Sequence, residues 1–257
     1  MKLNGIAFII TIYNHQIDQV QNLINNIHEK IQYTLHKSNY KIVIVNNGNS
    51  ELYFNDADCI NVGKNVGYCE GNNIGIRSIT DQETIIICNP DVEIINSLIF
   101  DYIYGYVNLS KCICGKLVGT SSWYTYAASF PTDKQYDPDE LPFYYNEPTL
   151  TKPGNWKPFR YIDGHFFGFS RKLFDDIDGF NKNIFPGYFG ESEFCFRAYL
   201  HDYSLQNVTM DGFVVHNQNH SVKYQDDVVT WTEIGRKYAY SNVFLPNWDK
   251  FIEYLCE

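Results

Sequence analysis

Carboxylates that could bind a metal ion or accept a proton stand at two places in the sequence. Asp91 closes the run Asn89-Pro90-Asp91, directly after the apolar stretch 85–88. A carboxylate at the end of a strand can bind a divalent cation, because Mg²⁺ prefers oxygen ligands and commonly takes one or two carboxylates together with substrate phosphates. The same residue types are also favoured in turns, so the run by itself leaves both interpretations open.

The second place holds Glu191 and Glu193, two residues apart where a helix is expected to begin. A glutamate that is buried, or that has other carboxylates nearby, has a raised pKa and can act as a general base. Acidic side chains in a first helical turn also suit the helix dipole, which is a purely structural reason for their presence. His216 ends the apolar stretch 213–215, and it becomes a candidate metal ligand only if Asp91 lies within its reach.

Glycines recur every four residues at positions 63, 67, 71 and 75. The spacing is neither Gly-x-Gly-x-x-Gly nor a P-loop, so it does not indicate a dinucleotide or phosphate loop. Glycines at this spacing favour a helix that packs closely on a sheet. A role in ligand binding follows only if the other motifs support it.

Composition excludes several classes of protein. The chain has 257 residues, 44% of them hydrophobic, and a formal net charge of −10. The apolar content excludes a disordered chain, and the negative charge makes nucleic acid an unsuitable partner. The seven cysteines are odd in number and form no Cys-x-x-Cys, and no apolar run reaches the length of a membrane span. We therefore expect free thiols, no signal peptide, and a reducing cytoplasmic location.

Continuous apolar runs typical of buried strands alternate with apolar residues at helical spacing, and this order predicts an open α/β sheet in the first hundred residues. Strands are expected at 6–12, 42–45, 59–62 and 85–88. Helices are expected at 20–31, with Asp18 as a cap, and at 71–79. Ligands bind beyond the carboxyl ends of the strands in such sheets, which is where Asn14, Asn47 and Asp91 fall.

The second half of the chain is less regular. Residues 120–160 are expected to form loops and short antiparallel strands. Later elements are expected as a strand at 166–170, a short helix before 179, a helix at 191–201, a strand at 213–215, and helices on both sides of Pro246. We expect a single domain over 1–257, with a donor half at 1–100, an acceptor and catalytic half at 101–225, and a C-terminal helical segment at 226–257.

Taken in order, these motifs resemble the inverting glycosyltransferases of family 2, and most closely their rhamnosyltransferase-like bacterial members. The resemblance spans roughly residues 5–221. The matching pieces are Thr11-Ile12-Tyr13-Asn14, Val45 with Asn46 through Ser50, Asn65 through Gly75, Asn89-Pro90-Asp91, Asp163-Gly164, Gly179-Phe180, Gly190 through Arg197, and His216 followed by Ser221.

The resemblance implies a GT-A fold, a Rossmann-like α/β architecture with a mostly parallel central sheet and helices on both faces. It implies a metal-dependent enzyme that uses Mg²⁺ or Mn²⁺ and transfers a sugar, with inversion, from a UDP- or dTDP-linked donor. The acceptor would be a hydroxyl of a glycan or a lipid-linked glycan, in the synthesis of a bacterial surface polysaccharide or glycoconjugate. A lipid-linked acceptor would bring the protein into peripheral contact with the inner membrane.

The resemblance also assigns roles to residues. Glu191 would be the catalytic base, and Asp91 and His216 the metal ligands. The donor would be bound by Thr11, Tyr13, Asn14, Asn46, Asn65, Gly67, Asn73 and Asn89. Asp163, Gly164 and Glu193 would line the sugar or acceptor pocket, where Trp123, Tyr124 and Trp156 are candidates for stacking. Three positions differ from the family pattern: Asn46 and Glu191 each replace Asp, and Gly190 replaces Glu.

Two other functions stay open at this point. A sugar nucleotidyltransferase has a similar core, but it would need a Gly-rich loop with Arg or Lys after the first strand, and residues 11–15 do not provide one. A non-catalytic protein that binds nucleotide sugars or glycans is compatible with Asn46 and Gly190. Metal-dependent turnover of a donor would exclude the non-catalytic alternative.

Overall fold

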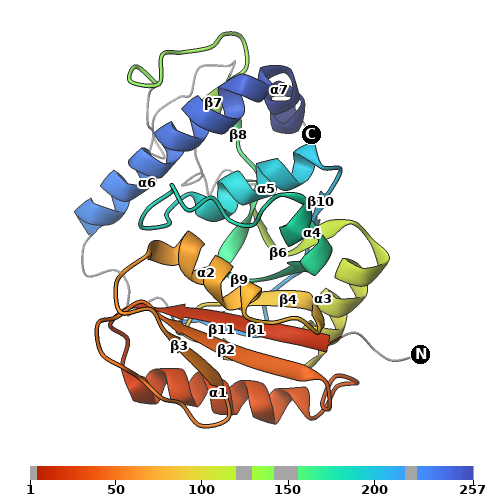
Figure 1. The fold of residues 1–257 in the computed structure, drawn as a ribbon. Coiled ribbons are helices and arrows are strands. Elements are labelled where there is room, and N and C mark those ends of the chain that lie inside the picture. Colours follow the sequence, from red (N-terminus) through yellow and green to blue (C-terminus); the bar gives the residue numbers. More distant parts are fainter. Residues whose placement is uncertain (1–4, 120–128, 142–155, 218–224, 257) are drawn as a thin grey trace.

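The described residues, 5–119, 129–141, 156–217 and 225–256 of a computed structural model, are built around a seven-stranded sheet (Figure 1). Its order is β10-β6-β9-β4-β1-β2-β3. β9 runs antiparallel to its neighbours β4 and β6, whereas the other neighbouring pairs run parallel. The bounds are β1 (Gly5–Ile12), β2 (Tyr40–Asn46), β3 (Asp58–Asn61), β4 (Gln82–Cys88), β6 (Cys112–Val118), β9 (Tyr161–Ser170) and β10 (Ser204–Asn207). The predicted, mostly parallel α/β sheet is confirmed.

Both faces of the sheet are covered by helices, as the continuous apolar run of β1 predicts. Successive residues of β1 point to opposite faces: Phe8 packs in the cluster that includes α1 (Ile17–Ile31) and α3 (Leu98–Leu109). Ile9 packs in the cluster that includes α2 (Gly67–Arg77) and α5 (Gly190–Leu200). Figure 1 shows α1 below the strands and α2 and α5 above them.

The expected strands and helices of the first hundred residues are all present, with one correction. Asp18 does not cap α1, because the helix begins one residue earlier and its N-cap is Gln16. Asp18 instead lies in the first turn, where a negative charge suits the helix dipole. The prediction also missed α3, whose sequence is almost entirely apolar and aromatic and has little polar periodicity.

Shorter elements lie outside the seven-stranded sheet. They are β5 (Val92–Ile94) paired with β11 (Val214–His216), β7 (Ser129–Pro131) paired with β8 (Trp156–Pro158), and α4 (Arg171–Asp176). α4 begins as the sequence suggests, since the Ser170 hydroxyl accepts a hydrogen bond of 3.1 Å from Leu173 N. The β5–β11 pair lies beside the carboxyl end of β4, and this pairing is what brings His216 back to Asp91.

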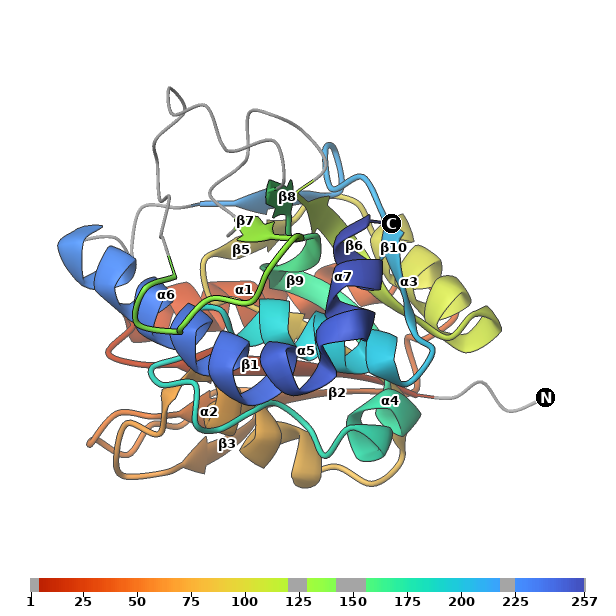
Figure 2. The ribbon, with the colours of Figure 1, turned by 90° about the horizontal axis from the view of Figure 1, so that it is seen from above.

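The C-terminal segment is helical on both sides of Pro246, as expected. It runs through α6 (Gln225–Ala239), the π-helical turn η1 (Tyr240–Phe244), the 3₁₀ turn η2 (Leu245–Asn247) and α7 (Trp248–Cys256). Seen from above in Figure 2, α6 and α7 lie over α5. Phe244 and Phe251 stack at 4.5 Å between ring centroids, and Phe196 of α5 meets both. The sequence is rich in aromatic residues, with 21 Tyr, 18 Phe and 4 Trp, and these three phenylalanine rings belong to the core.

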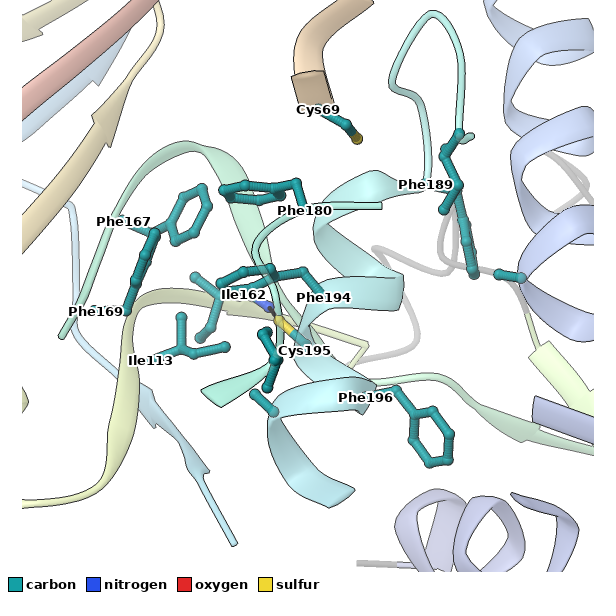
Figure 3. Packing of buried hydrophobic residues seen from close by; sticks show 14 of the residues in the cluster. Cys69, Ile113, Ile162, Phe167, Phe169, Phe180, Phe189, Phe194, Cys195 and Phe196 are labelled. Carbon is teal, nitrogen blue, oxygen red and sulfur yellow. Dashed lines mark hydrogen bonds between the residues drawn. The ribbon is translucent and has the colours of Figure 1, made fainter. Parts of the chain in front are cut away.

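Aromatic rings also fill the space between α5 and β9 (Figure 3). Phe180 stacks on Phe194 with centroids 4.2 Å apart, and both rings meet Phe169 of β9. The backbone N–H of Ile162 donates a hydrogen bond of 3.4 Å to Cys195 Sγ, which ties the start of β9 to α5. This packing fixes the helix that carries Glu191.

The seven cysteines are free thiols in the structure. Cys112 and Cys114 share one face of β6, and Ile113 points to the other. Among the described residues, the structure contains no helix that is both long and apolar enough to cross a membrane.

Candidate active site

A cavity of about 830 Å³ opens at the carboxyl ends of β1 and β4. Its other walls are formed by the start of α2, the start of β9, the segment before α5 and Trp231 of α6. The structure brings these predicted site residues together in its lining: Thr11, Tyr13, Asn14, Asn65, Gly67, Asn89, Asp91, Asp163, Gly164, Glu191 and His216. Motifs from both halves of the chain thus meet in one place.

Asp91 and His216 satisfy the condition set by the sequence. His216 Nε2 lies 3.2 Å from Asp91 Oδ1. Asp91 is buried, and its backbone carbonyl accepts a hydrogen bond of 2.9 Å from Asn217 N across the β5–β11 pair. Burial raises the pKa of Asp91, but the neighbouring His216 ring outweighs this, so the pKa lies below its ordinary value. Asp91 is therefore ionised at neutral pH.

His165 is a cavity residue that the sequence analysis missed. Its ring stacks on the ring of His216, with centroids 4.5 Å apart and planes 3° from parallel. Its Nδ1 lies 2.8 Å from Asp163 Oδ1, and its carbonyl accepts a hydrogen bond of 2.8 Å from Asn89 N. A histidine directly after the Asp163-Gly164 motif was the available signal.

Glu191 lies in the first turn of α5, deep in the cavity wall and partly accessible through it. Burial raises the pKa of Glu191 to about 7. A backbone hydrogen bond to its carboxylate lowers the pKa in part, and the negative charge of Asp163 raises it further. Burial also raises the pKa of Asp163, but His165 more than offsets it, so that pKa lies below its ordinary value. Two neighbouring carboxyls with pKa values pushed apart is the arrangement expected of an acid or base beside a permanent charge.

Glycines let α2 approach the sheet beneath the cavity. A Cβ at Gly71 would lie 2.5 Å from Thr11 Cγ2, and one at Gly75 would lie 2.7 Å from Ile9 Cγ2. The close-packing interpretation is therefore confirmed for Gly71 and Gly75, whereas Gly63 precedes α2 and a Cβ there would meet nothing within 4 Å. The close packing also serves the site, because it places the N-terminus of α2 at the cavity. There the Tyr68 hydroxyl donates a hydrogen bond of 2.9 Å to Gly164 O.

Two predicted donor ligands lie outside the cavity lining and are corrected. Asn46 is buried; its Nδ2 donates to Ser50 O at 2.7 Å and to Asn61 Oδ1 at 2.8 Å. Asn73 is also buried; its Nδ2 donates to Phe180 O and its Oδ1 accepts from Phe180 N. These amides hold loops in place, because their hydrogen-bonding groups are used within the protein. Asn47 lines the cavity instead.

Glu193 and Trp156 are corrected for the same kind of reason. Glu193 is fully buried and forms an ion pair with Arg197, with Oε1 2.6 Å from Nε and Oε2 2.9 Å from Nη2. Trp156 is buried in the core against Tyr136. Neither lines the cavity. The other two aromatic candidates, Trp123 and Tyr124, lie outside the described residues, as does Ser221.

Gly190 has a packing explanation. A Cβ at this position would lie 2.4 Å from Cys69 Sγ. The start of α5 approaches α2 so closely that the carboxylate expected from the family resemblance has no room here. Burial, rather than a carboxylate at position 190, is what raises the pKa of Glu191.

The donor set suits a divalent cation that is shared with a ligand. Asp91 Oδ1 is buried without an aligned hydrogen-bond donor. Among the described residues, no group of three or more His, Cys, Asp or Glu side chains is placed to hold a metal. The described lining also contains no Lys or Arg. A divalent cation held by Asp91 and His216 would have coordination positions left for oxygens of a bound anion.

The chain is similar to known glycosyltransferases in sequence and in fold. No protein-family model matches the chain. The chain is 26% identical over 252 residues to the low-salt glycan biosynthesis hexosyltransferase Agl10 of Haloferax volcanii, a match that covers 93% of this chain and 76% of that protein.

Solved structures share the fold. The mannosyltransferase PcManGT of Pyrobaculum calidifontis, in complex with GDP-Man and Mn²⁺, superposes with a TM-score of 0.57 at 10% identity, over 99% of this chain and 75% of its own. The catalytic domain of Drosophila beta1,4galactosyltransferase 7, in complex with xylobiose, gives a TM-score of 0.51 at 12% identity. This match covers 84% of this chain and 71% of the galactosyltransferase chain. The fold is of the GT-A type.

Proposed function

We propose that this protein is a metal-dependent glycosyltransferase that moves a hexose from a nucleoside diphosphate sugar to a hydroxyl of an acceptor glycan, with inversion. One observation carries the proposal. A single cavity holds the ionised Asp91 beside His216 and, in the wall formed by α5, a glutamate whose pKa is raised to about 7. The similarity to a hexosyltransferase and the GT-A fold support the same class of reaction.

The charge of the cavity explains why a cation is needed. Asp91, Asp163 and Glu191 line it, and the described lining offers histidines but no Lys or Arg to offset a diphosphate. A divalent ion held by Asp91 and His216 would supply a Lewis acid that stabilises the charge on the leaving diphosphate. The stacked His165 ring restricts the orientation of His216, which keeps its nitrogen directed at Asp91.

Glu191 is the group suited to accept the acceptor's proton. A base is most effective when its pKa lies near the working pH, and burial raises the pKa of Glu191 to about 7. The carboxylate takes the proton as the hydroxyl oxygen attacks the anomeric carbon from the face opposite the diphosphate. A single displacement inverts the configuration, and it requires one base only. Holding both substrates in line supplies much of the remaining acceleration.

The donor is expected to lie along the ends of β1 and β4. Thr11, Tyr13, Asn14, Asn65 and Asn89 line this side of the cavity. The family resemblance implies a pyrimidine base, but it gains no support from Asn46, whose amide is used internally. The donor panel therefore includes GDP sugars beside UDP and dTDP sugars. We propose a glycan or lipid-linked glycan as acceptor, in the synthesis of a surface polysaccharide or glycoconjugate.

Donor turnover tests the proposal. The protein is incubated with UDP, dTDP and GDP hexoses, Mn²⁺ and glycan acceptors, and released nucleoside diphosphate is quantified by chromatography. The expected result is turnover of at least one donor, lost in Glu191→Gln and kept in Glu51→Gln, which replaces an exposed carboxylate outside the cavity. Donor binding without any turnover would support the non-catalytic alternative instead.

A further inference from the structure

Three aromatic side chains form one wall of the cavity beside Glu191. They are Phe185, Tyr188 and Trp231, here called the aromatic wall. Phe185 is 51% exposed, whereas Tyr188 and Trp231 are half-buried. The Tyr188 and Trp231 rings lie 5.7 Å apart between centroids at an interplanar angle of 30°. Large apolar rings left partly open in a cavity that also holds carboxylates indicate a surface that a ligand covers.

The backbone holds this wall in place. Trp231 lies on α6, one helical turn before Gly235 and therefore on the same face. A Cβ at Gly235 would lie 2.2 Å from Tyr188 O, so α6 approaches the segment before α5 directly at this point. The same segment is bound to α2, since Tyr68 N donates a hydrogen bond of 2.6 Å to Pro186 O. The rings are thus positioned by three helices.

The position of the wall decides which substrate it meets. Tyr188 stands three residues before Glu191, so the wall leads into the turn that carries the proposed base. The diphosphate would instead be received by Asp91, directly before β5, and by His216, at the end of β11. A ring that packs on the wall would present its hydroxyl to Glu191. This is the place of the acceptor, provided that the proposed function holds.

The chemistry around the wall selects a neutral sugar. A pyranose has C–H groups on its ring faces, which pack on aromatic rings, and hydroxyls at its edge, which donate to carboxylates. Asp163 and Glu191 supply such carboxylates, and the described lining has no Lys or Arg. An acceptor residue with its own negative charge would be repelled here.

We propose that Phe185, Tyr188 and Trp231 form an acceptor subsite that binds the ring of an uncharged sugar and directs one of its hydroxyls to Glu191.

The test measures glycoside and nucleotide binding separately. Saturation-transfer NMR is recorded with the methyl glycosides of glucose, galactose, mannose and N-acetylglucosamine, and with methyl glucuronide as the charged comparison. The proteins are the wild type, Trp231→Ala, Trp231→Phe, Tyr188→Ala and Tyr33→Ala; Tyr33 is 76% exposed and outside the cavity. Calorimetry with UDP, dTDP and GDP plus Mg²⁺ is run on the same proteins.

We expect at least one neutral glycoside to bind the wild type and methyl glucuronide to bind more weakly. The affinity of the neutral glycoside should fall at least tenfold in Trp231→Ala and Tyr188→Ala. It should largely recover in Trp231→Phe and stay unchanged in Tyr33→Ala. Nucleotide affinity should be equal in all five proteins. The subsite is refuted if no neutral glycoside binds the wild type, or if glycoside affinity is unchanged in both Trp231→Ala and Tyr188→Ala. It is also refuted if those two variants lose nucleotide binding instead. Absence of nucleotide binding to the wild type would refute the proposed function, not the subsite.

Discussion

Replacing Glu191 by glutamine is expected to stabilise the protein at pH 8, although it removes the proposed base. Burial raises the pKa of Glu191 from 4.5 to about 7. Below pH 4.5 the carboxyl is neutral in the folded and the unfolded chain alike, so its titration does not change the free energy of unfolding. As the pH rises from 4.5 to 7, the unfolded chain loses this proton first. Stability then falls by about 1.4 kcal/mol per pH unit, about 3 kcal/mol in all.

Urea denaturation followed by circular dichroism at pH 4.5 and pH 8 measures this effect. Glu191→Gln should match the wild type at pH 4.5 and exceed it by about 3 kcal/mol in free energy of unfolding at pH 8. Glu193→Gln is the matched control on the same helix. It should lose about 3 kcal/mol at pH 8, because it leaves the partly buried Arg197 without its charge partner. A Glu191→Gln variant that gains nothing at pH 8, or gains equally at both pH values, would refute the buried-base interpretation.

Three other outcomes follow from the geometry. First, kcat/KM for transfer should fall about tenfold per pH unit below pH 7, because the base must be ionised; a flat profile from pH 5 to 8 would exclude Glu191 from this role. Second, Gly190→Ala should lower the free energy of unfolding in urea by about 1–3 kcal/mol, because its Cβ would meet Cys69 Sγ at 2.4 Å, and equal stability would show that α5 can shift. Third, Gly71→Ala should lower the free energy of unfolding by a similar amount, because its Cβ would collide with Thr11. Gly105→Ala in α3, which has open space around it, should instead raise the free energy of unfolding by about 0.5–1 kcal/mol in the same assay.

The fold could be predicted because its signals are local. The continuous apolar run of β1 is buried on both faces. The apolar residues at helical spacing in α1 are also buried, namely Val20, Leu23, Ile24, Ile27 and Ile31. The site could be predicted because its motifs follow strand ends, and strand ends in parallel sheets converge. Asp91 lies at the cavity for that reason, since it follows β4, whereas Glu191 reaches the cavity from the first turn of α5 and His216 from the end of β11.

What the sequence could not give depends on contacts between distant segments. Nothing local distinguishes Asn73, whose amide is used by the backbone of Phe180, from Asn65, which stands at the cavity. The stack of His165 on His216 requires β9 and β11 to be placed first. Trp231 reaches the cavity only because α6 packs on the segment before α5, so helical periodicity alone does not reveal it.

Metal-dependent nucleotide binding tests the central claim, that Asp91 and His216 hold a cation that binds a diphosphate. Calorimetric titration of UDP, dTDP and GDP, each with Mn²⁺ or with EDTA, is run on the wild type, Asp91→Asn and Glu93→Gln. Glu93 is the matched control, since it is exposed, two residues away on β5 and outside this cavity. The account predicts binding that strengthens at least tenfold with Mn²⁺, loses that gain in Asp91→Asn and keeps it in Glu93→Gln. Binding that is equal with Mn²⁺ and EDTA, or unchanged in Asp91→Asn, would contradict it.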